Sequence, residues 1–494
     1  MLFNSTEFLF FFPIVLAAYL VMPKKARIPW LLVASYFFYG CWNYKYLTLI
    51  LFSTVVTYAS ARLLEKSSSA KTKKWILGLG ISANLFVLFF FKYLDFAFMN
   101  VNRLLRAIHV NPVANPFDFL LPVGISFFTF QAVGYVIDVY RGDVPAEKNF
   151  IKYALFVSFF PQLVAGPIER SKNLLGQIKA LEEKRTWTKD GLVSGLGMML
   201  WGLFMKMVIA DRVAIFVDEV FANTYAAGTM EMAAAAVGFS LQIYADFAGY
   251  SVVAIGAARM LGLNLMENFN TPYFATSIAE FWRRWHVSLS TWFRDYVYIP
   301  LGGNRKGKLR KYLNLMITFL VSGLWHGAAW KYVAWGGLHG AYQIAGDLTK
   351  PLRKRINEFL EVKEDTFGHR LGRIAGTFFL TTFAWIFFRA DSLRLAIDYV
   401  IGTFTKWNPW VLFDDSLYGW GLNHFEMNLL AMAVLILLAV SLLRSRRGMD
   451  LGQYLLTQNV LFRWAVMLGL ALLILVFGEY GVDFDSNKFI YFDF

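Results

Sequence analysis

His326 lies at the end of a mostly apolar run, where burying an ionisable side chain costs free energy. His326 ends the stretch that begins at Tyr312, which is apolar apart from Asn314, Thr318 and Ser322. An ionisable group in such a run is a candidate functional residue that faces the interior of a helix bundle. Desolvation would keep the imidazole neutral, which suits a general base near pH 7. A structural histidine at a helix-helix contact is the alternative, and the neighbouring Gly323 and Gly327 fit either interpretation.

A second histidine lies in a segment with helical periodicity. Between Ile278 and Tyr296 the large apolar residues recur at spacings of one, three and four residues, which predicts one amphipathic helix. Its other positions are too polar for a membrane span but suit an interface or the wall of a wet cavity. His286 borders the tryptophan-rich face, so it either lines the same cavity as His326 or lies at the membrane interface.

His339 is a weaker candidate, because it follows His326 by thirteen residues. On one continuous helix the two side chains would point to nearly opposite sides. A turn near Trp330 and Lys331 would bring them together, but we do not predict a catalytic role for His339.

Two carboxylates also fall inside apolar runs. Asp138 precedes Arg141 by three residues, whereas Asp246 has no cation adjacent to it in the sequence. Each carboxylate either pairs with a neighbouring base or marks a functional polar path through the bundle.

The composition indicates that lipid is the solvent for most of these residues. Of the 494 residues, 57% are hydrophobic, 18% are aromatic and only 17% are charged, and the mean hydropathy is +0.47. An ordinary soluble domain has roughly 25% charged residues. We therefore predict an all-α, polytopic membrane protein with roughly ten to twelve transmembrane or re-entrant helices. We expect a single domain over residues 1–494, with the histidine-bearing core at about 119–348.

The formal net charge is +14. The basic residues that produce it form short clusters between apolar runs, which is typical of the cytoplasmic loops of a membrane protein and not of a nucleic-acid-binding surface. If the cluster from Arg305 to Lys311 is cytoplasmic, His326 lies about 22 Å farther along the helix, beyond the membrane midplane. The chain has one cysteine, Cys41, which excludes an internal disulfide and a cysteine-based metal cluster. We expect Cys41 to be buried, and we expect no metal site.

Several motifs together resemble one family of membrane enzymes. They are EFWRRWHVSLSTW from Glu280 to Trp292, LGGNR from Leu301 to Arg305, GLWHG from Gly323 to Gly327, and DFAGYS from Asp246 to Ser251. This set resembles the membrane-bound O-acyltransferase (MBOAT) family, in particular its bacterial alginate O-acetyltransferase branch, over nearly the whole chain. Val287 replaces an expected isoleucine and Ala248 a commoner serine, and neither departure affects a catalytic position.

The resemblance implies that His326 is the catalytic histidine and that His286 is a second functional residue. It implies transfer of acetyl groups from cytoplasmic acetyl-CoA, through a central funnel or tunnel, to an acceptor on the periplasmic side of a bacterial inner membrane. The expected partners are a periplasmic SGNH-type acetyltransferase, an exopolysaccharide synthesis complex that makes an alginate-like polymer, and membrane lipid.

Within this scheme we predict a lining for the substrate path, formed by Trp285, Trp292, Trp325, Asp246 and Asp138. Arg305, Lys306 and Lys308 would attract the phosphates of CoA, or they would serve only as topology signals. A transporter or flippase of a lipid-linked saccharide is the alternative function, with Asp138, Asp246 and His326 as gating or proton-relay groups. A non-catalytic scaffold for a synthase is a third possibility.

Overall fold

The computed structural model describes residues 1–117, 121–164, 166–480 and 490, and these form helices and loops with no strand among them. The all-α prediction is confirmed. Positions 119, 120 and 165 of the predicted core lie outside the described residues. The chain divides into two compact units: unit 1 is Met1–Met199 with Ser251–Met266, and unit 2 is Leu200–Tyr250 with Glu267–Phe494. The helices α10 (Lys189–Phe204) and α12 (Thr229–Met260) contribute residues to both units.

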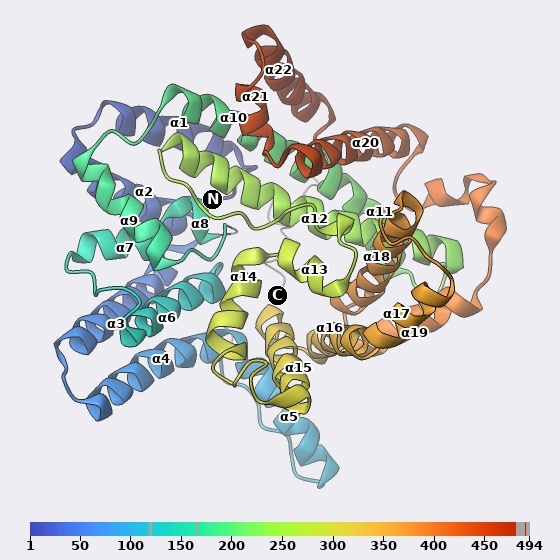
Figure 1. Cartoon of the computed structure of the whole chain (residues 1–494), viewed down its shortest axis with the longest axis horizontal. Helices are drawn as coiled ribbons and strands as arrows, with labels where there is room; N and C mark the ends of the chain where they lie inside the picture. The colour runs from blue at the N-terminus through green and yellow to red at the C-terminus, as the bar shows by residue number, and fades with distance from the viewer. Residues whose placement is uncertain (118–120, 165, 481–489, 491–494) are drawn as a thin grey trace. The chain divides into compact units, whose positions relative to one another are not determined.

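Unit 1 contains the helices of the first part of the chain, coloured blue to teal in Figure 1. They are α1 (Thr6–Val21), α2 (Lys24–Asn43), α3 (Leu47–Lys66), α4 (Ala70–Lys92), α5 (Leu94–Ala107), α6 (Ile125–Arg141), α7 (Phe150–Ser158), α8 (Phe160–Leu163) and α9 (Ser171–Glu183). Cys41, near the end of α2, is exposed. The expectation of a buried cysteine is therefore wrong, because no residue in the described part of the chain covers the thiol.

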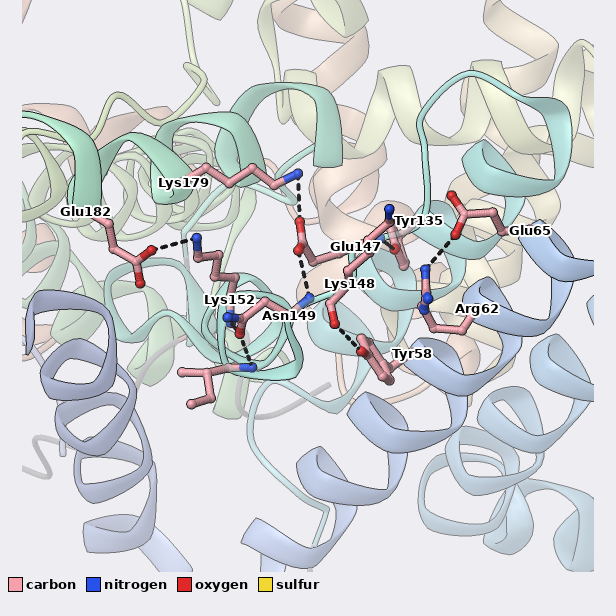
Figure 2. A network of polar contacts seen from close by, with 11 residues as sticks. Tyr58, Arg62, Glu65, Tyr135, Glu147, Lys148, Asn149, Lys152, Lys179 and Glu182 are labelled. Atoms are coloured by element: carbon pink, nitrogen blue, oxygen red, sulfur yellow. Dashed lines mark hydrogen bonds and ion pairs between the residues drawn. The ribbon is translucent and has the colours of Figure 1, made fainter. Parts of the chain in front are cut away.

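The loop between α6 and α7 is held by the polar network in Figure 2. Glu147 accepts hydrogen bonds from Lys179 Nζ at 2.7 Å and from the backbone N–H of Asn149 at 2.8 Å. The backbone N–H of Glu147 in turn donates to Tyr135 Oη at 2.7 Å. Asn149 then caps α7, since its side chain accepts from the backbone N–H groups of Ile151 and Lys152. The network thus connects α6, the start of α7 and α9 within unit 1.

Unit 2 contains the candidate histidines. After the π-helical stretch Met205–Ala210 its elements are α11 (Asp211–Ala222), α13 (Ile278–Arg284), α14 (Val287–Phe293), the π-helical turn Arg294–Tyr298, α15 (Gly307–His326), α16 (Trp330–Leu348), α17 (Lys350–Phe359), α18 (Phe367–Arg389), α19 (Leu393–Thr405), α20 (His424–Arg447), α21 (Leu451–Leu456) and α22 (Val460–Phe477). Local signals set several of these boundaries. Asn423 and Glu426 form a capping box at the start of α20, and Gly448 ends that helix with a positive φ.

Seven helical stretches among the described residues are long and apolar enough to cross a membrane. One of them, Lys24–Lys66, includes both α2 and α3. Helix α15 is not among the seven, because it combines a basic first turn with polar residues along its length. The multi-pass membrane character is therefore confirmed, whereas the number of ten to twelve spans stays a prediction.

Helices α15 and α16 cross closely because glycines meet at the crossing. A Cβ atom on Gly323 would overlap the carbonyl oxygen of Tyr332 and would lie 3.4 Å from the Cα atom of Gly336. A Cβ atom on Gly336 would in turn overlap the carbonyl oxygen of Phe319. This close approach places the C-terminal end of α15, which carries His326, against the first turns of α16.

Gly323→Ala is expected to lower the stability of the protein by about 1–3 kcal/mol, because the added methyl group forces the two helix backbones apart. The measurement is the melting temperature of the detergent-solubilised protein. Gly337→Ala is the matched control, since a Cβ atom there would meet only Leu320 Cδ2 at 3.6 Å, an ordinary contact. Equal melting temperatures for the two variants would contradict the close-crossing explanation.

Candidate active site

His326 is the last residue of α15, and its side chain is buried among aromatic rings. Its ring centroid lies 5.0 Å from Trp325, 4.9 Å from Trp335 and 5.5 Å from Phe388, each in an edge-to-face arrangement. The residue is 3% exposed. Aromatic walls of this kind limit the access of water and restrict the orientation of the imidazole.

The segment that carries His286 is broken, and the prediction of one continuous amphipathic helix is wrong. Helix α13 ends at Arg284, Trp285 is extended, and His286 has a φ of 42° before α14 begins. Figure 1 shows α13 and α14 as two separate helices. The left-handed conformation costs a non-glycine residue about 1–3 kcal/mol. Backbone hydrogen bonds support it: the N–H of Val287 donates to the carbonyl of Asn268, and the N–H of Ser290 donates to that of His286, both at 2.9 Å. The predicted apolar residues from Ile278 to Phe293 are nevertheless buried.

The His286 side chain is completely buried and hydrogen-bonded on one side. Its Nδ1 lies 3.1 Å from Asn268 Oδ1, which also accepts from Ser288 Oγ at 2.7 Å. Burial lowers the pKa of His286, which lies outside the candidate membrane spans, to about 3. The imidazole is therefore neutral at physiological pH. Asn268 and Ser288 were not predicted, because no local spacing pattern links Asn268 to a histidine eighteen residues later.

Trp325 lies close to both His286 and His326. Its ring centroid is 5.0 Å from that of His326 and 6.2 Å from that of His286. Phe247 covers another side of His286, at 4.7 Å. The structure thus brings the predicted residues His286, His326 and Trp325 together, whereas the contributions of Phe247, Trp335 and Phe388 had no recognisable sequence signal.

The other two predicted tryptophans lie in the surrounding aromatic layer. Trp285 packs against Phe269 at 5.0 Å and Trp385 at 5.1 Å. Trp292 contacts Phe293 at 5.6 Å, and Phe293 reaches Trp325 at 6.4 Å. Both tryptophans are buried. Their assignment to a substrate path stays a prediction.

His339 lies behind the wall of the site. The turn at Gly327–Ala329 separates α15 from α16, and Trp335 lies between the two histidines, 4.9 Å from His326 and 5.0 Å from His339. His339 Nδ1 accepts a hydrogen bond from Trp282 Nε1 at 3.2 Å. The side chain therefore ties α13 to α16, which is a structural contact.

Asp246 is paired with a lysine from a neighbouring helix. Lys206 Nζ lies 2.8 Å from Asp246 Oδ1 and 2.7 Å from Asp211 Oδ1, and all three side chains are almost fully buried. The second carboxylate oxygen of Asp246 accepts from the backbone N–H of Ile490 at 2.9 Å. The interpretation in which Asp246 pairs with a base is therefore the one that the contacts favour. Its sequence neighbour Phe247 contacts His286.

The remaining predicted residues lie away from the two histidines or in the other unit. Asp138 belongs to unit 1, where its Oδ2 accepts from Ser171 Oγ at 3.3 Å. Arg305, Lys306 and Lys308 are exposed around the start of α15. Since His326 ends the same helix eighteen residues after Lys308, the basic cluster and the imidazole are about 27 Å apart along the axis.

These features define a multi-pass helical membrane protein with two buried histidines in an aromatic site. Residues 144–388 match the membrane-bound O-acyltransferase family. Over 446 residues the chain is 39% identical to the probable alginate O-acetylase AlgI of Pseudomonas putida, which covers 90% of this chain and 86% of the relative. The chain therefore belongs to the membrane-bound O-acyltransferase family, and it is an O-acyltransferase.

Relatives named for other substrates match as well. The peptidoglycan O-acetyltransferase of Helicobacter pylori is 35% identical over 81% of this chain and 79% of its own length. The teichoic acid D-alanyltransferase of Bacillus subtilis is 28% identical over 47% of this chain and 60% of its own length. The chain is thus similar to proteins named for different polymers and for different acyl groups.

Proposed function

We propose that this protein takes acetyl groups from acetyl-CoA on the cytoplasmic side of a bacterial inner membrane and delivers them to a hydroxyl acceptor on the periplasmic side. The observation that supports this most strongly is the placement of His326 at one end of α15 and the basic cluster at the other. Positively charged loops favour the cytoplasm. An acyl donor bound near the cluster would then have its reactive end directed toward a base on the far side.

His326 is proposed as the general base. A ring nitrogen removes the proton of the acceptor hydroxyl, and the oxygen attacks the thioester carbonyl of acetyl-CoA. The tetrahedral intermediate collapses with cleavage of the carbon–sulfur bond, and the thiolate of CoA takes the proton back from the imidazolium. The products are an acetyl ester and CoA with a free thiol, so protons and electrons balance. Because Trp325, Trp335 and Phe388 surround the imidazole, competing hydrolysis by water is suppressed.

Acceptor and partners are proposed from the relatives. Relatives that cover 90% and 81% of this chain are named for alginate and peptidoglycan O-acetylation, so we propose an exopolysaccharide of the alginate type as the final product. An SGNH-type acetyltransferase in the periplasm would receive the acetyl group and pass it to the polymer. Arg305, Lys306 and Lys308 would bind the phosphates of CoA from the cytoplasm.

Proteoliposomes that contain the purified protein test this function. With acetyl-CoA labelled in the acetyl group and the periplasmic partner present, we expect release of free CoA thiol and label on the partner or on added polysaccharide. A flippase would instead move a fluorescent lipid-linked saccharide across the bilayer without thioester cleavage. No thioester turnover in any mixture, together with saccharide movement, would replace our proposal by the transporter alternative.

A further inference from the structure

The hydrogen bonds around His286 define which of its nitrogens is basic. Three contacts converge on Asn268 Oδ1: His286 Nδ1 at 3.1 Å, Ser288 Oγ at 2.7 Å and the backbone nitrogen of Ser288 at 3.4 Å. A backbone N–H can only donate, so the side-chain atom of Asn268 that faces it is the oxygen and not the amide nitrogen. That oxygen can only accept. His286 Nδ1 must therefore carry the proton, because two lone pairs at 3.1 Å would repel each other.

The Ser288 hydroxyl does not donate its proton to His286 Nδ1. Its hydroxyl lies 3.5 Å from His286 Nδ1 but only 2.7 Å from Asn268 Oδ1, so its proton is directed to the amide oxygen. Asn268 and Ser288 are both buried, at 1% and 0% exposed. The backbone adds a second link, since Val287 N–H donates to the carbonyl of Asn268 at 2.9 Å. The loop before α13 and the turn before α14 are thus joined at His286 itself.

We infer that Asn268, supported by Ser288, is a positioning residue that fixes His286 in the Nδ1-protonated tautomer, so that Nε2 is the basic atom within the aromatic site. The arrangement follows the general rule that the partner of one imidazole nitrogen decides the chemistry of the other. This inference rests on the proposed function for its catalytic consequence, in which His286 Nε2 accepts a hydrogen bond or a proton from the reacting groups beside His326. The tautomer itself does not depend on that function.

Nitrogen-15 spectra of the full-length protein with labelled histidine test the tautomer directly. The signals of His286 are those that disappear in His286→Gln, and their chemical shifts report which ring nitrogen bears the proton. We expect a protonated Nδ1 in the parent protein and in Asn268→Asp, whose carboxylate can still accept the bond. In Asn268→Leu, which keeps the side-chain size but has no acceptor, we expect the proton to move to Nε2. A parent spectrum with an unprotonated Nδ1 would overturn the inference, even if Asn268→Leu fails to fold.

Acetyl-transfer kinetics test the consequence. Asn268→Leu is expected to lower kcat by about 100-fold, a typical contribution of one acid-base group, with little change in KM. Asn268→Asp should stay within about tenfold of the parent. Asn270→Leu is the matched control, because Asn270 is exposed and lies two residues away, and both its spectrum and its rate should equal those of the parent. A parental rate for Asn268→Leu would refute the positioning role. If the parent protein itself transfers no acetyl, the proposed function fails while the tautomer result stands.

Discussion

His326→Gln is expected to reduce the rate of acetyl transfer by about 10²–10⁴-fold, the usual contribution of a general base. Glutamine approximates the size of imidazole and can still form hydrogen bonds, so the wall of Trp325, Trp335 and Phe388 should retain its packing. It cannot take up a proton near pH 7. The loss should therefore appear in kcat, in proteoliposomes with labelled acetyl-CoA, without a matching fall in the amount of folded protein.

His369→Gln serves as the control for this substitution. His369 lies in the first turn of α18 and is only partly buried, so its replacement should leave transfer unchanged. The same assay shows which of the two buried histidines, His326 or His286, is the general base. If His326→Gln transfers acetyl at the parental rate while His286→Gln abolishes transfer, His286 is the base, and the roles that we assign are exchanged.

The sequence predicted those parts of the site that depend on local periodicity and burial. The apolar spacing from Ile278 to Phe293 correctly identified the buried residues, and the apolar run before His326 correctly identified a buried histidine. The break at Trp285 and His286 was not predictable in this way. It depends on backbone hydrogen bonds to the preceding loop, from Val287 N–H to Asn268 and from Asn270 N–H to Arg284, and periodicity does not detect such bonds.

The partner of Asp246 was missed for a similar reason. Lys206 is forty residues earlier and belongs to a π-helical stretch, so an inspection of adjacent residues finds no cation for this carboxylate. The π-helical stretch shifts the phase of the side chains from that of an α-helix. Pairing between helices is decided by their packing, which hydropathy alone does not specify.

Lys206→Met is expected to destabilise the protein by about 3–5 kcal/mol, the usual cost when one partner of a buried ion pair is removed. The substitution leaves the carboxylates of Asp211 and Asp246 next to each other, almost fully buried and without the ammonium group that lies within 2.8 Å of both. The measurement is the melting temperature of the detergent-solubilised protein, with chemical denaturation as a second reading. Because Asp246 adjoins Phe247, which contacts His286 at 4.7 Å, acetyl transfer should also fall.

Lys311→Met provides the matched control, since the same substitution there breaks a pair with Asp347 whose side chains are 33% and 40% exposed. Water can solvate the remaining carboxylate, so the expected loss is below about 1 kcal/mol. The triple variant Lys206→Met, Asp211→Asn and Asp246→Asn removes all three charges together and should recover much of the lost stability, because no uncompensated charge remains buried. If Lys206→Met and Lys311→Met destabilise equally, or if the triple variant is as unstable as Lys206→Met, the buried charges are not what holds these helices together. Packing around Lys206 would then be the cause.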